Sequence, residues 1–408
     1  MRMTMVDSID QIDWQRADLR DPTKRQVLAE SIAEIESGSV EHSLFHDLAW
    51  LLEAEGRGPD DVRVYICRAG ARPSGHAPFV VQPWLMRFRI GEVTLFSRSF
   101  ERLHISGGPV TRSTDSGEVR ADLVAKLFAQ VRPLLTRRQV IYLEGVVKGS
   151  EVELAIAANS TRRMFRVIEP TPRYERRLIR FPSNFEEYLR SLKTQTRQNL
   201  RNTQRKLEKH LTGNLRLVRY DRTDQISEFV GRAVAISKKT YQWHLLGLGL
   251  RKADQLEQTL VAMARHGWTR CYLLECDGAA TAFMIGYLYF GTYYYVDVGF
   301  DPDWEKWSVG TVLHMEVLRD LMDGEGQARS FDFSSGSGVH KKRFSNDSRE
   351  EANYILVPRS ARNAVFLGAF HAMNALSAAA VGLLERLHLK AAIKRLVRRH
   401  ATDKATDN

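Results

Sequence analysis

The residues best suited to chemistry in this sequence lie between positions 294 and 340. Three of them can accept a proton and two tyrosines can donate one: Asp297, Asp332 and His340, with Tyr294 and Tyr295. A carboxylate or a histidine can take the proton of an attacking amine, and a tyrosine hydroxyl can give a proton to a leaving thiolate. This combination of residue types suits the transfer of an acyl group from a thioester to an amine. Each of the three bases remains a candidate for the general base.

A second group of residues suits the binding of phosphate. A helix is expected to begin near Ser308, and the first turn of a helix carries unpaired backbone N–H groups and positive potential. Gly310 leaves room for a phosphate, and Ser308 is expected to cap the helix. We therefore expect the pyrophosphate of an acyl donor to bind there. The expected phosphate-binding residues are Lys306, Ser308, Val309, Gly310 and Thr311.

Strands must hold these two groups together. The segment 292–299 reads TYYYVDVG, which is typical of a buried β-strand. Strict alternation along this strand would place Tyr295 and Asp297 on one face, and Tyr294 and Val298 on the other. The glycine- and serine-rich loop after a short strand ending at 331–333 would then carry the remaining candidates.

The composition is that of a globular protein with an anionic partner. The chain has 408 residues, of which 43% are hydrophobic and 27% charged, with a formal net charge of +11. That length allows two sizeable cores. The positive excess indicates a phosphorylated cofactor, nucleic acid or an acidic membrane surface as partner. A basic helix expected at 193–210 is either a solvated face or a phosphate contact, and its few aromatic residues argue against nucleic acid other than tRNA.

The cysteines and histidines follow no metal-binding pattern. The three cysteines are scattered through apolar runs, so neither a disulfide framework nor a metal site is expected, and the cytoplasm is the expected compartment. The first residues lack an apolar signal segment. The histidines of the first half are likewise expected on the surface or in a polar core: His42, His46, His76 and His104.

Three regions are expected. Residues 1–172 form a first domain in which no catalytic pattern is found, residues 173–360 carry the chemistry, and residues 361–408 form an amphipathic basic helical tail. The sequence EPTP at 169–172 marks the boundary. Three alternatives remain for the tail: packing on the protein, lying in an anionic membrane surface through residues 364–400, or spanning a membrane. The second makes the protein peripheral at the inner membrane.

Residues 174–357 resemble the GNAT-type acetyltransferases of the CelD/BioF-like family, which is related to the FemABX group of double-GNAT proteins. The motifs that carry the resemblance are SKKTY at 237–241, the hairpin at Asp277-Gly278, GFDPDWEKWSVGTVL at 299–313 and FDFSSGSGVHKKRF at 331–344. The resemblance implies an α/β (α+β) fold. Two tandem GNAT-like domains would each have a mixed, mostly antiparallel sheet flanked by helices.

The resemblance also implies a reaction. Acetyl-CoA or another acyl-CoA would be the donor, with its pyrophosphate at the helix starting near Ser308. The acceptor would be a primary amine on a small molecule, a sugar or a lipid-linked group, and family members often lie beside bacterial cellulose or exopolysaccharide genes. The residues assigned to substrate or phosphate binding are Lys239, Trp243, Lys341 and Arg343.

The sequence departs from the superfamily's phosphate motif, and two other functions stay open. Gly310 is present, but Trp307 stands where the motif has Gln or Arg, and His340 replaces the usual tyrosine of the later loop. One alternative is a FemABX-like transferase that uses aminoacyl-tRNA, which the basic helix favours, although no inserted coiled-coil arm is visible. The other is a non-catalytic, membrane-associated component of a polysaccharide synthesis complex.

Overall fold

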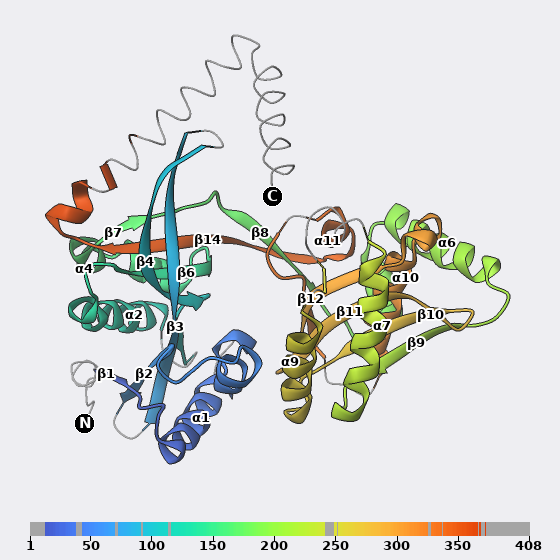
Figure 1. Ribbon diagram of the computed structural model, residues 1–408, viewed down its shortest axis with the longest axis horizontal. Helices are drawn as coiled ribbons and strands as arrows, with labels where there is room; N and C mark the ends of the chain where they lie inside the picture. Colours follow the sequence, from blue (N-terminus) through green and yellow to red (C-terminus); the bar gives the residue numbers. More distant parts are fainter. Residues whose placement is uncertain are drawn as a thin grey trace, which may run out of the picture.

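The computed structural model describes most of the chain (Figure 1). The described residues are 13–37, 43–69, 72–90, 93–112, 116–240, 249–250, 252–324, 328–336, 338–365, 367–368 and 372. Trp243 and nearly all of the tail expected at 361–408 lie outside them. Within these ranges, no helix is long and apolar enough to cross a membrane.

The first half of the chain contains the two longest strands, β3 and β4, together with shorter strands and helices. Its elements are β1 (Asp13–Arg16), α1 (Pro22–Ser37), the short helical segments η2 (Leu44–His46) and η3 (Trp50–Ala54), β2 (Val62–Ala69), β3 (Arg72–Ile90), β4 (Val93–Ser106), β5 (Val110–Thr111), α2 (Gly117–Val131), η4 (Arg132–Leu134), β6 (Gln139–Val147), α3 (Glu151–Ala157), α4 (Asn159–Met164) and β7 (Phe165–Ile168). β3 and β4 form a long hairpin that extends beyond the rest of this half (Figure 1).

The second half begins with a strand and two helices before it resumes a similar order. Its elements are β8 (Tyr174–Arg180), α5 (Phe185–Ser191), α6 (Thr194–His210), β9 (Leu215–Tyr220), η5 (Thr223–Gln225), α7 (Ile226–Lys238), α9 (Ala253–Arg265), β10 (Cys271–Cys276), β11 (Ala279–Tyr289), β12 (Thr292–Phe300), η6 (Pro302–Trp307), α10 (Val309–Asp323), β13 (Ser330–Asp332), α11 (Val339–Phe344) and β14 (Asp347–Pro358).

The two halves share one plan. In each, a strand is followed by three helical segments, three antiparallel strands, a helix, and a strand that pairs in parallel with the third of the three. The parallel pairs are β4 with β6 and β12 with β13. This repetition confirms the expected fold class of two tandem α/β units with mixed sheets.

A single sheet runs through both halves. Its strand order is β1-β2-β3-β4-β6-β14-β8-β13-β12-β11-β10-β9. β14 makes the connection: its residues 347–351 pair with β8, whereas residues 351–358 pair with β6 and β7 of the first half. The last strand of the chain therefore completes the sheet of the first half, and Figure 1 shows it reaching across both. The domain boundary at 172 stays a prediction, because the sheet is continuous across it.

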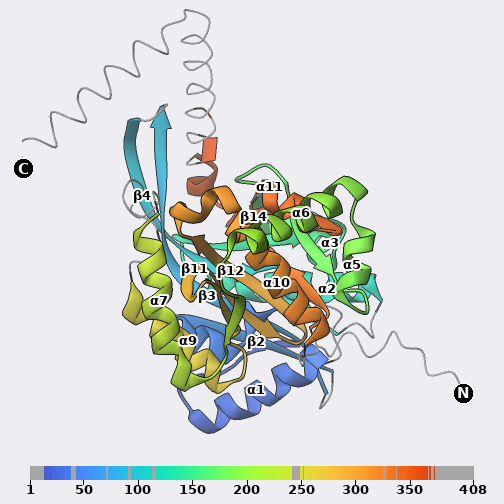
Figure 2. The ribbon, with the colours of Figure 1, turned by 90° about the vertical axis from the view of Figure 1, so that its right-hand side faces the viewer.

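Three large apolar cores and one smaller cluster, around Phe100 and Ile355, are found among the described residues. One lies within the first half around α2, and a second lies in the second half between the sheet and α10. The third, which we call the joining core, combines α1, η2 and η3 with α7, α9 and β11. In it the ring of Trp50 meets the edge of Tyr287 at 5.0 Å between centroids. Figure 2 shows α7 and α10 on opposite sides of β11 and β12.

A β-bulge in β12 changes which side chains share a face. Ile285 of β11 lies opposite Asp297. The next residue, Gly286, lies opposite Tyr295, so Val296 is the extra residue. The expectation that Tyr295 and Asp297 share a face is therefore wrong, since one inserted residue reverses the alternation. Asp297 instead lies on the face of the joining core, to which its partner Ile285 belongs.

Candidate functional site

β12 separates from β13 in the middle of the second half. The two strands pair in parallel over only three residues each, and the last pair is Tyr294 with Asp332. Beyond Tyr294, β12 keeps β11 as its only strand partner among the described residues. Its Tyr295 carbonyl accepts a hydrogen bond from the Ser334 hydroxyl at 2.8 Å, and Val296 at the bulge is half exposed. Beyond this point one edge of β12 has no strand beside it among the described residues, which leaves that edge for a ligand.

Asp332 is held by Arg176 of β8. Arg176 Nε donates to both carboxylate oxygens at 2.9 and 3.0 Å, and its Nη2 donates to Oδ2 at 2.7 Å. Ser334 N donates to Oδ1 at 2.8 Å. Asp332 is buried. Burial of Arg176 lowers the pKa of its guanidinium, but the nearby carboxylates of Asp332 and Glu351 outweigh this effect and raise that pKa above its ordinary value. With both oxygens engaged, Asp332 is better placed to position the loop than to accept a proton.

The two candidate tyrosines point to opposite faces of β12. Tyr294 lies in the joining core, with its ring 5.7 Å from that of Phe45 in the first half. Tyr295 lies in the core of the second half, beside the ring of Phe333, and Val298 packs on that core as well. Burial raises the pKa of both hydroxyls, and the charge of Asp332 raises that of Tyr294 further. Both therefore remain protonated, as a general acid must be.

Asp297 is the candidate base on the same face as Tyr294. Its Oδ1 accepts a hydrogen bond from the N–H of Val298 at 2.8 Å. No cation among the described residues forms an ion pair with it. Burial raises the pKa of its carboxyl group above the usual value, and only that backbone hydrogen bond opposes the shift. A carboxylate with a raised pKa is a stronger base than an ordinary one.

The cluster of basic residues at 340–343 lies on α11. Lys341 is buried, and its Nζ donates to the carbonyls of Phe333 at 2.7 Å and Ser335 at 2.6 Å. Burial lowers its pKa. Lys341 thus closes the loop after β13 and does not extend toward solvent, whereas Arg343 is exposed. His340 belongs to α11, but its side chain lies outside the description.

The helix expected near Ser308 is α10, which begins at Val309. The expected capping bond from the Ser308 side chain is not formed, and that expectation is wrong. Ser308 has φ +55° and ψ +42°, because it ends η6 and begins α10 at once. Its N–H bonds the Glu305 carbonyl at 2.9 Å, and its carbonyl accepts from Thr311 N at 2.9 Å. The N–H groups of Val309 and of Gly310 have no intrahelical acceptor at this position.

Gly310 leaves limited space at the helix start. A Cβ atom there would lie 3.4 Å from the Phe300 ring, so alanine fits and a larger side chain would project over the first turn. The Gly310 carbonyl bonds His314 Nδ1 at 2.9 Å. The backbone of this turn is therefore fixed from within the helix.

Basic side chains of α6 gather beside this helix start. His210 stacks on the indole of Trp307 with ring centroids 3.8 Å apart. Lys206 Nζ lies 5.3 Å from the Trp307 ring, and Lys306 Nζ lies 5.2 Å from it. Two lysine side chains therefore lie near the ring of Trp307, which stands where the superfamily motif has Gln or Arg. The end of the predicted basic helix and the predicted phosphate ligand Lys306 are brought together.

Lys239 supports the turn that leads to α10. Its Nζ lies 2.5 Å from Oδ2 of Asp301, which is buried. Asp301 Oδ1 in turn accepts from the N–H of Asp303 and caps η6. This ion pair raises the pKa of Lys239. Lys239 is therefore placed to hold η6, and its predicted contact with substrate remains a prediction.

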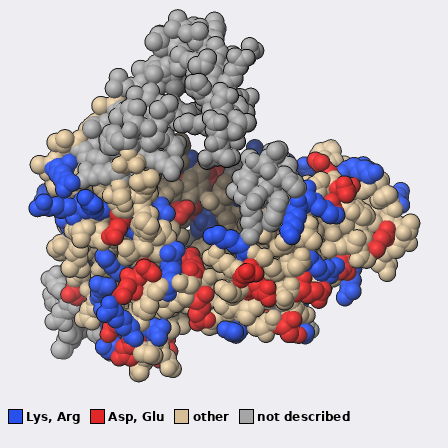
Figure 3. Space-filling model, viewed as in Figure 1, with Lys and Arg blue, Asp and Glu red and all other residues tan. Residues whose placement is uncertain are grey.

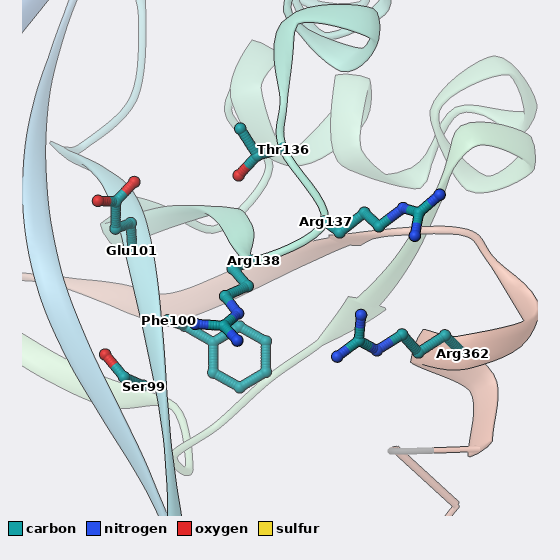
Figure 4. A pocket seen from close by; sticks show the side chains of 7 residues that line it. All are labelled: Ser99, Phe100, Glu101, Thr136, Arg137, Arg138 and Arg362. Atoms are coloured by element: carbon teal, nitrogen blue, oxygen red, sulfur yellow. The ribbon is translucent and has the colours of Figure 1, made fainter.

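The site lies where the two halves meet. Figure 3 shows a recess between them with both positive and negative side chains at its walls. A pocket of about 460 Å³ lies elsewhere, in the first half beside the end of β14. Figure 4 shows Arg137, Arg138 and Arg362 around it. That pocket contains neither a tyrosine nor a histidine, and its one carboxylate belongs to Glu101.

Sequence reasoning missed Arg176 and Glu351, the two partners that β8 and β14 bring to Asp332 and its loop. Arg176 Nη1 lies 3.7 Å from Oε2 of Glu351. The only signal for Arg176 is an arginine at a strand position in YERRLIR, and many exposed strands have the same composition. Neither residue could be assigned to the site without knowing the strand order.

Comparison with known proteins gives a family match and many structural matches, two of which are described here. Residues 194–342 match the model of an acetyltransferase (GNAT) domain. The structure of FemX is 10% identical and has a TM-score of 0.58, covering 81% of this chain and 95% of that chain. A conserved protein of unknown function from Bacteroides thetaiotaomicron VPI-5482 is 13% identical with a TM-score of 0.50, covering 85% and 100%. No curated protein sequence matches the chain. At these identities, the structural matches establish the fold alone.

We predict that removing the guanidinium of Arg176 destabilises the whole fold. Arg176→Met leaves the buried Asp332 carboxylate without its partner, which costs about 3–5 kcal/mol in the free energy of unfolding. Arg180→Met is the matched control on the same strand, since its ion pair with Asp347 is exposed and contributes under about 1 kcal/mol. Urea denaturation measures both, and equal losses for the two variants would contradict this account.

We also predict that Asp297→Asn stabilises the protein at neutral pH. Burial raises the folded-state pKa of Asp297 above the unfolded value, so the charged carboxylate penalises folding above that raised pKa. The gain of the variant should therefore be present at neutral pH and vanish as pH falls toward the unfolded pKa. Asp303→Asn, at an exposed position, is the control. Melting temperatures across pH test this, and a loss of stability in Asp297→Asn at pH 7 would refute it.

Proposed function

We propose that this chain is an acyltransferase, because its residues 194–342 match the model of an acetyltransferase (GNAT) domain. The proposed reaction transfers an acyl group from acetyl-CoA or another acyl-CoA to a primary amine. The proposed acceptor belongs to exopolysaccharide or cell-envelope metabolism, as the resemblance of the sequence implies. The observation that carries the proposal is the separation of β12 from β13 beside the start of α10.

The separation suits a thioester donor. The extended acyl-CoA arm would pair with the free edge of β12 after Tyr294, where the bulge at Val296 leaves backbone N–H groups for the thioester carbonyl. Its pyrophosphate would meet the N–H groups of Val309 and Gly310 at the start of α10. Lys206 and Lys306 would add positive charge beside it.

The chemical step needs one base and one acid. The amine nitrogen attacks the thioester carbon, the C–S bond breaks as the C–N bond forms, and the amine proton passes to a base. We assign the base to Asp297, whose carboxylate has a raised pKa and no ion-pair partner within the described structure. We assign the proton donor to Tyr294, which lies on the same face of β12 and keeps its proton. Asp332 and Lys341 position the loop after β13.

A second candidate is transfer from aminoacyl-tRNA. The observation that favours it is the position of α6, whose basic end lies beside the start of α10 and whose Arg205 is exposed. A helix of this charge can contact the phosphates of a nucleic acid as readily as those of CoA. In that case the same β12 edge would receive the aminoacyl ester.

We predict that enlarging Gly310 weakens binding of acetyl-CoA. Gly310→Leu places a side chain over the first turn of α10, next to Phe300, and should raise the dissociation constant at least about tenfold, or about 1.4 kcal/mol. Gly231→Leu, on an exposed face of α7 with open space around it, should leave the constant unchanged. Isothermal titration calorimetry with acetyl-CoA measures both variants.

The same measurements separate the candidates. Equal binding of acetyl-CoA by the wild type and the Gly310→Leu variant would refute the proposed phosphate site. Binding of aminoacyl-tRNA that weakens steeply with salt, without binding of acetyl-CoA, would favour the second candidate. A protein that binds neither donor would overturn both, and would favour a non-catalytic role in a polysaccharide synthesis complex.

A further inference from the structure

Three side chains of the first half lie close together, and none of them belongs to the residues proposed for acyl transfer. Glu36 lies in the last turn of α1, His46 ends η2 and His76 lies in β3. They are 1%, 2% and 0% exposed. One potential ligand atom from each lies within 4.8 Å of those of the other two. Three ionisable groups are thus enclosed together, although the sequence analysis expected no metal site from their spacing.

The hydrogen bonds of His46 fix which of its ring nitrogens is available. Its Nε2 lies 2.5 Å from the carbonyl oxygen of Ser106. A carbonyl can only accept, so Nε2 carries the proton and Nδ1 presents a lone pair. That Nδ1 atom is buried and has no hydrogen-bond partner in the described structure.

His76 completes the cluster beside Glu36. Its Nε2 lies 2.9 Å from Oε1 of Glu36, and its Nδ1 is also buried without a hydrogen-bond partner among the described residues. Two imidazoles with an unused nitrogen each are costly to bury, since an unsatisfied buried polar atom costs about 1–3 kcal/mol. Because both imidazoles lie beside one carboxylate, we expect a ligand to bind between these three side chains.

The donor set indicates the class of that occupant. Two imidazole nitrogens and one carboxylate oxygen are ligands typical of Zn²⁺, whereas Mg²⁺ and Ca²⁺ prefer oxygen ligands throughout. The bond from His46 Nε2 to a backbone carbonyl is the kind of contact that orients a metal-binding imidazole.

We propose that Glu36, His46 and His76 bind a divalent transition-metal ion of the zinc class. The ion would tie the end of α1 and η2 to β3. Phe45, the residue before His46, packs on Tyr294 of β12, so the site would fix the wall of the first half against the strand that carries the proposed chemistry. This role does not depend on which acyl donor the protein uses.

The test is metal binding by the full-length protein after removal of metal with a chelator. We predict that the wild type binds one equivalent of Zn²⁺. When Co²⁺ is added instead, the protein should show the visible absorption of a four- or five-coordinate Co²⁺ ion. Either ion should raise the melting temperature. Glu36→Gln and His76→Asn should each weaken binding by at least about 100-fold. His104→Asn should not, because His104 pairs with Glu144 at 2.8 Å but belongs to no such cluster.

Two outcomes would overturn the proposal. One is a wild-type protein with neither a Co²⁺ spectrum nor a rise in melting temperature. The other is unchanged Zn²⁺ affinity in the folded Glu36→Gln or His76→Asn variant, which would leave His76 and Glu36 as a buried pair without a metal ion. If the variants fail to fold, the wild-type titration and its Co²⁺ spectrum decide alone.

Discussion

The ion pair between Arg176 and Asp332 is the constraint on which the rest of the structure depends. Arg176 lies on β8, which sits between β14 and β13 at the junction of the two halves. Its bidentate contact fixes the end of β13 while β13 still pairs with β12 over its three residues. Because the chain turns away after Asp332, β12 continues with β11 as its only strand partner among the described residues, and the proposed donor site lies at the edge that this separation leaves.

A second constraint is the bulge at Val296, which decides the geometry of the chemical groups. By inserting one residue, it places Asp297 on the face of Tyr294 instead of that of Tyr295. The proposed acid and the proposed base thereby share the face where the first half packs through Phe45. The joining core thus links the proposed chemistry to the first half, in which no catalytic pattern was expected.

The sequence predicted the local elements of the second half well. The strand at 292–299, the helix near Ser308 and the basic helix at 193–210 appear as β12, α10 and α6, because their patterns depend on neighbouring residues. The bulge was not predictable from TYYYVDVG, since tyrosine, valine and aspartate can occupy either face of a buried strand. The capping role of Ser308 was wrong because η6 runs directly into α10 and forces a left-handed residue there.

The features that could not be predicted from the sequence depend on contacts between residues that are far apart in the chain. Arg176 and Asp332 are 156 residues apart. Lys341 was expected to bind substrate or phosphate, and only the fold brings its Nζ to the carbonyls of Phe333 and Ser335. The passage of β14 into the first half likewise leaves no local signal. η3 and β2 separate His46 from His76 in the sequence, so their approach depends on the fold alone.

The central claim is that acyl-CoA binds along β12 and at the start of α10. Amide hydrogen exchange of the full-length protein, with and without saturating acetyl-CoA, tests it most directly, since bound backbone N–H groups exchange more slowly. The account predicts slower exchange in residues 295–298 and 308–312 when acetyl-CoA is present. Unchanged exchange in both segments, with protection elsewhere or nowhere, would contradict it.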